Sequence, residues 1–130
     1  MDFSVYRPGP PLSVRTTLLA DEIGLLAPTG DIDMATAPLL AAAFEDLRRE
    51  HAPRAVVVEL AGVKFLGSAG LSCLANARAD TELALSRLTH AVRRALEVGG
   101  LREYFPCYDT TEEARDGLLQ RLSASVDRSA

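Results

Sequence analysis

The sequence predicts a single α/β domain, with a mixed, mostly parallel sheet packed with four helices. Short apolar runs that favour strands alternate along the chain with segments whose apolar residues recur at the spacing of a helix. Parallel strands need a crossover, which is usually a helix, so this alternation indicates parallel pairing. A length of 130 residues suits one hydrophobic core. The expected order is strand, strand, helix, strand, helix, strand, helix, strand, helix.

The first elements are an arm and a β-hairpin. Three prolines and a glycine in residues 1–11 predict a flexible or extended arm. Leu12–Leu19 and Ile23–Ala27 favour two strands, and the short Asp21–Glu22 turn between them indicates a hairpin. Pro28–Asp31 combines residues that break regular structure, so we expect the second strand to end there.

The next elements form the most informative part of the chain. Thr36 is expected to cap a helix over Ala37–Glu50, whose apolar residues recur at helical spacing. Ala55–Leu60 is an apolar run typical of a buried strand. A second apolar cluster and the turn Gly67–Gly70 follow, and a helix is expected over Ala69–Arg78. Such a junction gathers unpaired N–H groups and the positive end of a helix dipole.

The last third of the chain predicts two strands, two helices and a tail. Pro106 excludes a central strand, so the strand that contains it is expected at the edge of the sheet. The domain is expected over residues 12–122. Its remaining elements are a strand at Glu82–Leu88, a helix at Ala91–Val98, an edge strand at Tyr104–Tyr108, a helix from the capping box Thr110–Glu113 to about Leu122, and a polar tail at 123–130.

Composition excludes several classes of function. The net charge is −4 and no block of like charge occurs, so nucleic-acid binding has no electrostatic basis. No apolar run approaches the ~20 residues of a membrane span. The first residues lack the features of a secretory signal, and we therefore expect a cytoplasmic protein.

The two cysteines, Cys73 and Cys107, are expected as free thiols in that compartment. They form no CxxC motif, and with only two histidines in the chain no metal site is expected. Two small, half-buried thiols are the simpler interpretation. The alternative is a redox pair, which requires Cα atoms within ~7 Å of each other.

Enzymatic motifs around the turn fail on spacing. Neither a P-loop, a nucleophile elbow around Ser68 nor a dinucleotide fingerprint is complete, and no cofactor is expected. Asp31 and Asp33 form an acidic pair in one turn, which is more often a capping signature than a catalytic or metal site. A hydrolase using Ser68 would need a histidine within hydrogen-bond reach. We therefore do not expect an enzyme.

Four segments in order resemble the STAS-domain family of anti-sigma factor antagonists, between about Leu12 and Leu122. Each is weak alone, but together they keep the family's spacing. They are Gly30–Leu39, similar to the family's G-[ED]-[LI]-D turn and first helix; Ala55–Gly62, similar to its central strand; Phe65–Leu71, similar to its F-[LM]-D-S-[ST]-G-L signature; and Ala91–Leu101, similar to its V-x-R-x-L-E-x-[TS]-G-L segment.

The resemblance implies a fold and a function. It implies a STAS domain that binds an anti-sigma factor, usually a GHKL-type kinase, and so frees a sigma factor. The kinase reverses binding by phosphorylating the residue before the signature's final glycine. The implied contact surface comprises Gly30–Thr36 and Gly67–Leu74, with these partner-binding residues: Gly30, Asp31, Asp33, Thr36, Gly67, Ser68, Ala69, Gly70, Leu71 and Leu74.

The sequence departs from the family at the acceptor. Ala69 stands there without a hydroxyl, and Gly67 replaces the signature's acidic residue. Binding therefore carries over better than the phosphorylation switch, with Ser68 as a substitute acceptor. Two alternatives stay open: a small-ligand or nucleotide-binding STAS module, which a pocket near Gly67 would favour, and a Ser68 hydrolase. A homodimer, formed through Leu12–Leu19, is also left open.

Overall fold

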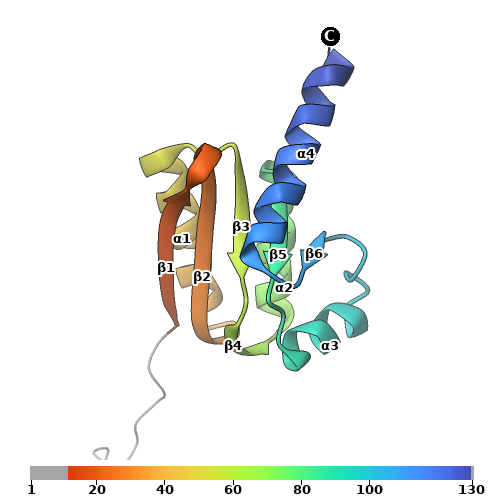
Figure 1. Ribbon diagram of the computed structural model, residues 1–130. Helices are drawn as coiled ribbons and strands as arrows, with labels where there is room; N and C mark the ends of the chain where they lie inside the picture. Colours follow the sequence, from red (N-terminus) through yellow and green to blue (C-terminus); the bar gives the residue numbers. More distant parts are fainter. Residues whose placement is uncertain (1–11, 130) are drawn as a thin grey trace, which may run out of the picture.

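A computed structural model describes residues 12–129, and side chains as far as Ala124. The expected arm at 1–11 lies outside the described residues. A six-stranded sheet has the order β1-β2-β3-β5-β6, with β4 pairing to β2 (Figure 1). The elements are β1 (Ser13–Leu19), a 3₁₀ turn (Ala20–Glu22), β2 (Ile23–Ile32), α1 (Ala37–His51), β3 (Ala55–Glu59), β4 (Gly62–Leu66), α2 (Ser68–Asp80), β5 (Leu83–Ser86), α3 (His90–Val98), β6 (Cys107–Tyr108) and α4 (Thr111–Ser129).

The predicted fold class is confirmed. β1 and β2 form an antiparallel hairpin, and all other described strand pairs are parallel. The hairpin closes at Asp21 and Glu22, whose φ values of 63° and 62° place both in the left-handed region. Positive φ at a hairpin turn gives a backbone twist that matches the twist of the flanking strands.

The predicted end of the second strand is wrong. β2 continues through Pro28 to Ile32, ten residues in all. Pro28 lies opposite Val14 of β1, so the strand is held on that side although the proline lacks an N–H. On its other side β2 pairs first with β3, along Ile23–Leu26, and then with β4, along Thr29–Ile32.

β4 is a strand that the sequence did not reveal. Its parallel pairing with the second half of β2 is irregular, because the register shifts between Gly30 and Asp31. Gly30 has φ +123°, a conformation that favours glycine. This bulge lets β2 and β4, which differ in length, end at the same level of the sheet. Beyond that level β2 leads into α1 and β4 leads into α2.

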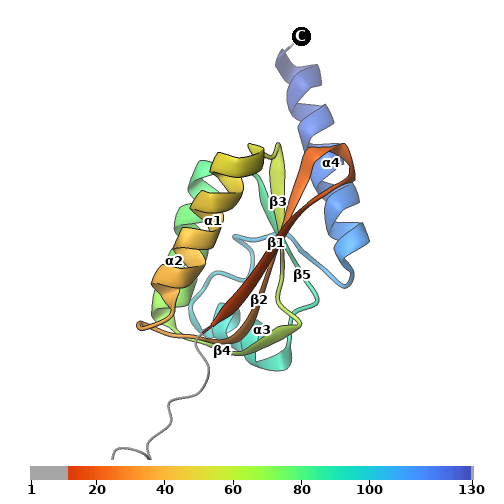
Figure 2. The same ribbon diagram turned by 90° about the vertical axis from the view of Figure 1, so that its left-hand side faces the viewer.

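The helices cover both faces of the sheet. Figure 2 shows α1 and α2 on one side and α4 on the other, while α3 lies at the end of the sheet near β4. The larger core cluster lies on the α1–α2 side and the smaller one lies beneath α4. The buried side chains of the larger cluster include Leu26, Leu40, Leu47, Val58, Leu74 and Leu85.

At the end of the chain, the capping box of α4 and the edge strand β6 match the sequence prediction, whereas the end of α4 differs from it. Thr110 accepts a hydrogen bond from the Glu113 N–H at 3.1 Å, as the capping box predicts, and β6 is a two-residue edge strand. The expected end of the last helix near Leu122 is wrong, because α4 continues to Ser129, so the expected polar tail is helical over 123–129. No glycine or proline follows Leu122 to stop the helix.

Candidate functional site

The two turns expected to bind a partner meet at one edge of the sheet. Asp31 pairs with Phe65, and Ile32 pairs with Leu66, in the last rungs of β2 and β4. Beyond them, the N–H of Gly67 donates to the Ile32 carbonyl at 2.9 Å. The turn into α1 and the turn into α2 therefore leave the sheet side by side, and both helix N-termini begin there.

The first turn is held by a reciprocal pair, Asp33 and Thr36. The Asp33 carboxylate accepts from the N–H of Thr36 at 3.0 Å, and the Thr36 hydroxyl accepts from the N–H of Asp33 at 2.9 Å. That hydroxyl lies 2.7 Å from the Asp31 carbonyl, to which it donates. This is the geometry of a capping box whose N-cap is Asp33.

The prediction that Thr36 caps α1 is right in position, because Thr36 directly precedes the helix, but wrong about its side chain. Thr36 already has helical φ and ψ, and its side chain makes no cap hydrogen bond to the helix. Asp33 supplies that acceptor because it is the residue at which the chain leaves the extended conformation of β2. Its Oδ1 is engaged within the turn and so orders the surface, whereas no described hydrogen bond reaches Oδ2.

The second turn presents a hydroxyl to solvent. Ser68 is the first residue of α2 and is exposed, whereas Ala69 is half-buried. The Phe65 ring folds back over Gly67, because its Cε2 lies 3.1 Å from the position of a Cβ on that glycine. A side chain at position 67 would displace the ring, so Gly67 allows Phe65 to cover the turn.

Two residues expected to contact a partner are buried instead. A Cβ on Gly70 would lie 2.6 Å from Cγ2 of Ile32, and Leu74 has no exposed surface. Leu71 is half-buried, with Cδ1 3.0 Å from the position of a Cβ on Gly99 at the end of α3. Gly70 and Leu74 thus support the surface from beneath, because the start of α2 rests on the ends of β2 and β4.

The structure adds two exposed apolar residues that were not among the expected partner-binding residues. Met34, in the first turn, is 84% exposed, and Phe65 is 51% exposed. An apolar residue between Asp33 and Ala35 in a polar turn is a signal that could have identified Met34. We define the double-turn surface as four exposed side chains in or beside the two turns: Asp31, Met34, Phe65 and Ser68.

A groove of about 760 Å³ runs between α1 and α2 from this surface. Its wall is mainly apolar and includes Ala41 and Phe44 of α1 and Ala77 of α2. Met34 and Ala69 line the end near the turns, and the charged side chains Glu45, Arg48 and Asp80 line the other end. Arg48 is paired with Glu45 at 2.6 Å, so its charge is already compensated.

The two cysteines lie on different elements and both thiols are free. Cys73 of α2 lines the groove, and burial raises the pKa of its thiol. Cys107 of β6 donates to the Phe105 carbonyl at 3.4 Å. Burial also raises the pKa of the Cys107 thiol, against a smaller lowering by Arg102 and Arg93. A raised pKa reduces the thiolate fraction and hence reactivity.

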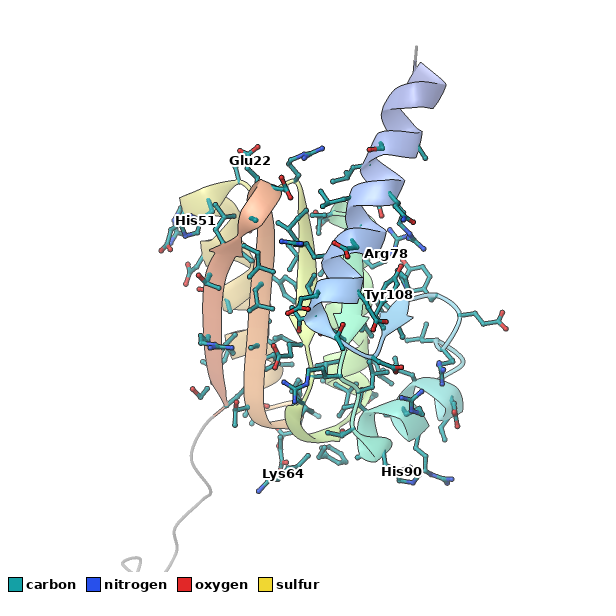
Figure 3. The ribbon with its side chains drawn as sticks, in the orientation of Figure 1. Glu22, His51, Lys64, Arg78, His90 and Tyr108 are labelled. Carbon is teal, nitrogen blue, oxygen red and sulfur yellow. The ribbon has the colours of Figure 1, made fainter. Side chains whose placement is uncertain are left out.

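The described residues give little support to a hydrolase site at Ser68 or to a metal site. His51 ends α1 at the opposite end of the molecule from Lys64 of β4, and His90 begins α3 (Figure 3). Neither histidine forms a described hydrogen bond with Ser68. Across residues 12–129, no group of three acidic, histidine or cysteine residues is placed to hold a metal ion. Within the same range, each helix is too short or too polar to cross a membrane.

The fold and the paired turns define an α/β domain with an exposed double-turn surface, and comparison with known proteins identifies its family. The STAS domain model matches residues 16–114, and the chain belongs to the STAS domain family. It is 30% identical over 109 residues to the anti-sigma-F factor antagonist RsfB of Mycobacterium tuberculosis, covering 79% of this chain and 88% of that protein.

Solved structures agree with this assignment. An anti-sigma factor antagonist from Mycobacterium paratuberculosis superposes with a TM-score of 0.74 at 30% identity, over 82% of this chain and 93% of that one. An anti-sigma-factor antagonist (STAS) domain protein from Planctomyces limnophilus gives a TM-score of 0.66 at 21% identity, over 82% and 97%. The second match supports the fold alone, because its identity is low.

Proposed function

We propose that this protein is an anti-sigma factor antagonist, which binds an anti-sigma factor through the double-turn surface and so frees a sigma factor for transcription. The observation that carries the proposal is the hydrogen-bonded junction of Ile32 and Gly67, which holds the exposed side chains of both turns on one edge of the sheet. The mycobacterial relatives that bear this name support it. We take the partner to be the GHKL-type kinase that the family resemblance implies.

Met34 and Phe65 are the anchors of this interface. Methionine and aromatic side chains are enriched in the cores of protein interfaces, where a few residues carry most of the binding energy. Ser68 and Asp31 lie beside them and supply polar contacts. Both α1 and α2 begin at the surface, so the positive ends of two helix dipoles favour acidic groups of the partner.

The surface differs in charge from the family pattern. An acidic residue in place of Gly67 would displace the Phe65 ring, which lies against that glycine. The family signature has both a phenylalanine and an acidic residue, so this chain keeps the aromatic ring at Phe65 and lacks the carboxylate. We infer that partner recognition here depends more on apolar anchors than on that charge.

Binding is not reversed at the family's acceptor position, because Ala69 has no hydroxyl to phosphorylate. We therefore propose a protein without the usual phosphorylation switch, and Ser68, exposed at the start of α2, is the alternative acceptor. A phosphate there would add about −1.5 to −2 charges beside Asp31 and would weaken docking. Mass spectrometry after incubation with kinase and ATP decides whether Ser68 is phosphorylated. Absence of phosphate on Ser68 means that the protein has no phosphorylation switch at this turn.

The experiment is titration calorimetry against each anti-sigma factor of the host, with and without ATP. We expect one of them to bind, and ATP to leave the affinity unchanged unless Ser68 is phosphorylated. Met34→Asp should abolish or weaken binding, whereas Ala124→Asp, an identical charge change at the exposed far end of α4, should not (Figure 1). Failure of every anti-sigma factor to bind would contradict the proposal.

The α1–α2 groove supports a second candidate, a module that binds a small ligand. Its volume of about 760 Å³ lies within the range of ligand sites, and one end opens at Met34 and Ala69. Because Arg48 pairs with Glu45, the carboxylate of Asp80 leaves the charged end of the groove net negative, which disfavours a nucleotide and favours an apolar ligand. Thermal shifts with apolar ligands and with nucleotides test this, and no shift with either class would exclude it.

A further inference from the structure

β1 is an edge strand, and no described element lies along its outer side (Figure 1). All seven of its residues pair with β2 without a bulge, from Ser13 opposite Thr29 to Leu19 opposite Ile23. An edge strand presents a row of unpaired N–H and C=O groups, which natural proteins block with prolines, bulges or charges. The described strand has none of these except Arg15.

We propose that β1 pairs antiparallel with β1 of a second copy of this chain, across a two-fold axis that passes through Thr16. The two sheets then join into one continuous sheet. A two-fold axis perpendicular to the sheet keeps each face on the same side, so the residue on the axis must lie opposite itself. This condition leaves few registers to consider.

Among these registers, the one centred on Thr16 is favoured by overlap and charge. It pairs all seven residues of the strand, from Ser13 to Leu19. Centring on Arg15 would place that cation opposite its own copy, which is unfavourable for like charges. Centring further along the strand leaves residues unpaired. In the favoured register Arg15 faces Thr17 of the second copy, and no like charges meet.

The same register covers exposed apolar surface. Val14 faces Leu18 of the second copy, and the pair occurs twice in the dimer. Leu18 is 39% exposed in the isolated chain, and it lies on the face beneath α1, because its partner Gly24 contacts Leu47 of that helix. Apolar cross-strand pairs of this kind stabilise a sheet by roughly 0.2–1 kcal/mol each.

The helix α1 fits the proposed dimer. It packs evenly on β1 and β2, so it lies above the space between these strands. With strands about 4.8 Å apart, the two copies of α1 would lie roughly 10 Å apart, which is a normal distance for packed helices. Leu39, 43% exposed, lies on the flank of α1 away from the α2 groove, and it would be covered by this contact.

The face opposite α1 offers no obstruction. α4 packs on β3, β5 and β6, and Leu19 at the end of β1 joins the core cluster beneath it. The double-turn surface lies at the ends of β2 and β4 rather than along β1, so two copies could bind two partners at once. The inference therefore does not depend on the proposed function.

Symmetric cross-linking tests the register. In a background of Cys73→Ser and Cys107→Ser, Thr16→Cys places two thiols opposite each other, with Cα atoms about 4.5–5.5 Å apart, within the range of a disulfide. Oxidation should convert this variant to the mass of a covalent dimer on non-reducing electrophoresis. Ser13→Cys is the matched control: its two copies would lie about 20 Å apart and should stay monomeric.

Two results would overturn the proposal. One is equal cross-linking of both variants, which would indicate random collision, and the other is no cross-linking of Thr16→Cys. Sedimentation of the unmodified chain provides an independent measurement, in which we expect a dimer that Leu18→Glu weakens about tenfold or more by placing a carboxylate in an apolar pair. A monomer at every concentration contradicts the proposal without affecting the anti-sigma factor experiment.

Discussion

The N–H of Gly67 donates a hydrogen bond to the carbonyl of Ile32 at 2.9 Å, and this bond fixes one turn of the candidate site against the other. Both turns leave the sheet immediately after this contact, so backbone geometry sets the position of Ser68 relative to Met34. Changes beneath the contact should therefore alter stability, whereas changes on the exposed side chains should alter binding and leave the fold intact.

Gly70→Ala tests the close packing beneath the second turn. The added Cβ would lie 2.5 Å from Cδ1 of Leu66 and 2.6 Å from Cγ2 of Ile32. Because Ile32 is buried in a central strand, it cannot move aside freely, and we expect a loss of about 1–3 kcal/mol in the free energy of unfolding. Urea denaturation followed by circular dichroism measures this loss.

Ser72→Ala is the control for that measurement. Ser72 lies on the same helix but is exposed, so its substitution should change stability by no more than about 0.5 kcal/mol. Equal stabilities for Gly70→Ala and the unmodified protein would mean that α2 shifts at little cost, and that the junction is less rigid than the contacts indicate.

Thr36→Val tests the reciprocal cap at the start of α1. The hydroxyl accepts from the Asp33 N–H at 2.9 Å and donates to the Asp31 carbonyl at 2.7 Å, and valine retains the shape without either bond. We expect a loss of about 1–2 kcal/mol in unfolding free energy, measured by urea denaturation. Asp33→Ala should cost a similar amount.

The double variant distinguishes a reciprocal cap from two independent contacts. Since Asp33 and Thr36 bond to each other, removing both should cost less than the sum of the single losses. Strict additivity would show that each residue acts on its own, and would contradict the capping box.

The alternation of strands and helices could be predicted from the sequence because it depends on local periodicity. β1, β3, β5 and the first three helices follow from apolar spacing of that kind, and the start of α4 follows from its capping box. β4 could not, since its five residues become a strand only through pairing with the far half of β2. The same long-range pairing carries β2 through Pro28, where local reasoning ended the strand.

The candidate site shows the same division. Motif resemblance identified the two turns, yet it could not separate residues that face solvent from those that face the core. Leu74 is fully buried and Met34 is largely exposed, although both are apolar residues in the matched segments. The choice between Asp33 and Thr36 as cap depends on backbone dihedral angles, which the sequence does not state.

Met34→Asp and Phe65→Ser should weaken anti-sigma factor binding by about tenfold or more each, because buried apolar anchors dominate interfaces of this kind. Both side chains are largely exposed in the free protein, at 84% and 51%, so stability should change little. Titration calorimetry gives the affinity, and thermal unfolding confirms the fold. Ala124→Asp serves as the control at the far end of α4. Unchanged affinity in both variants would locate the interface elsewhere.

The two thiols should react slowly at neutral pH and faster at alkaline pH. Burial raises the pKa of Cys73 and of Cys107 above the ordinary thiol value of 9.0, so little thiolate is present near pH 7. A raised pKa in the folded state means that folding disfavours the thiolate. The contribution to stability is therefore intact below pH 9 and is lost as pH rises through the folded-state pKa values. Iodoacetamide labelling across pH, followed by mass spectrometry, measures both rates.

Treatment with a thiol oxidant, followed by mass spectrometry, decides whether Cys73 and Cys107 form a redox pair. Their raised pKa values and their places on α2 and β6 lead us to expect that a thiol oxidant leaves the folded protein without an internal disulfide. In urea both thiols should label readily, since burial is then removed. A mass loss of two hydrogens in the folded protein, absent in Cys73→Ser and in Cys107→Ser, would establish the redox pair.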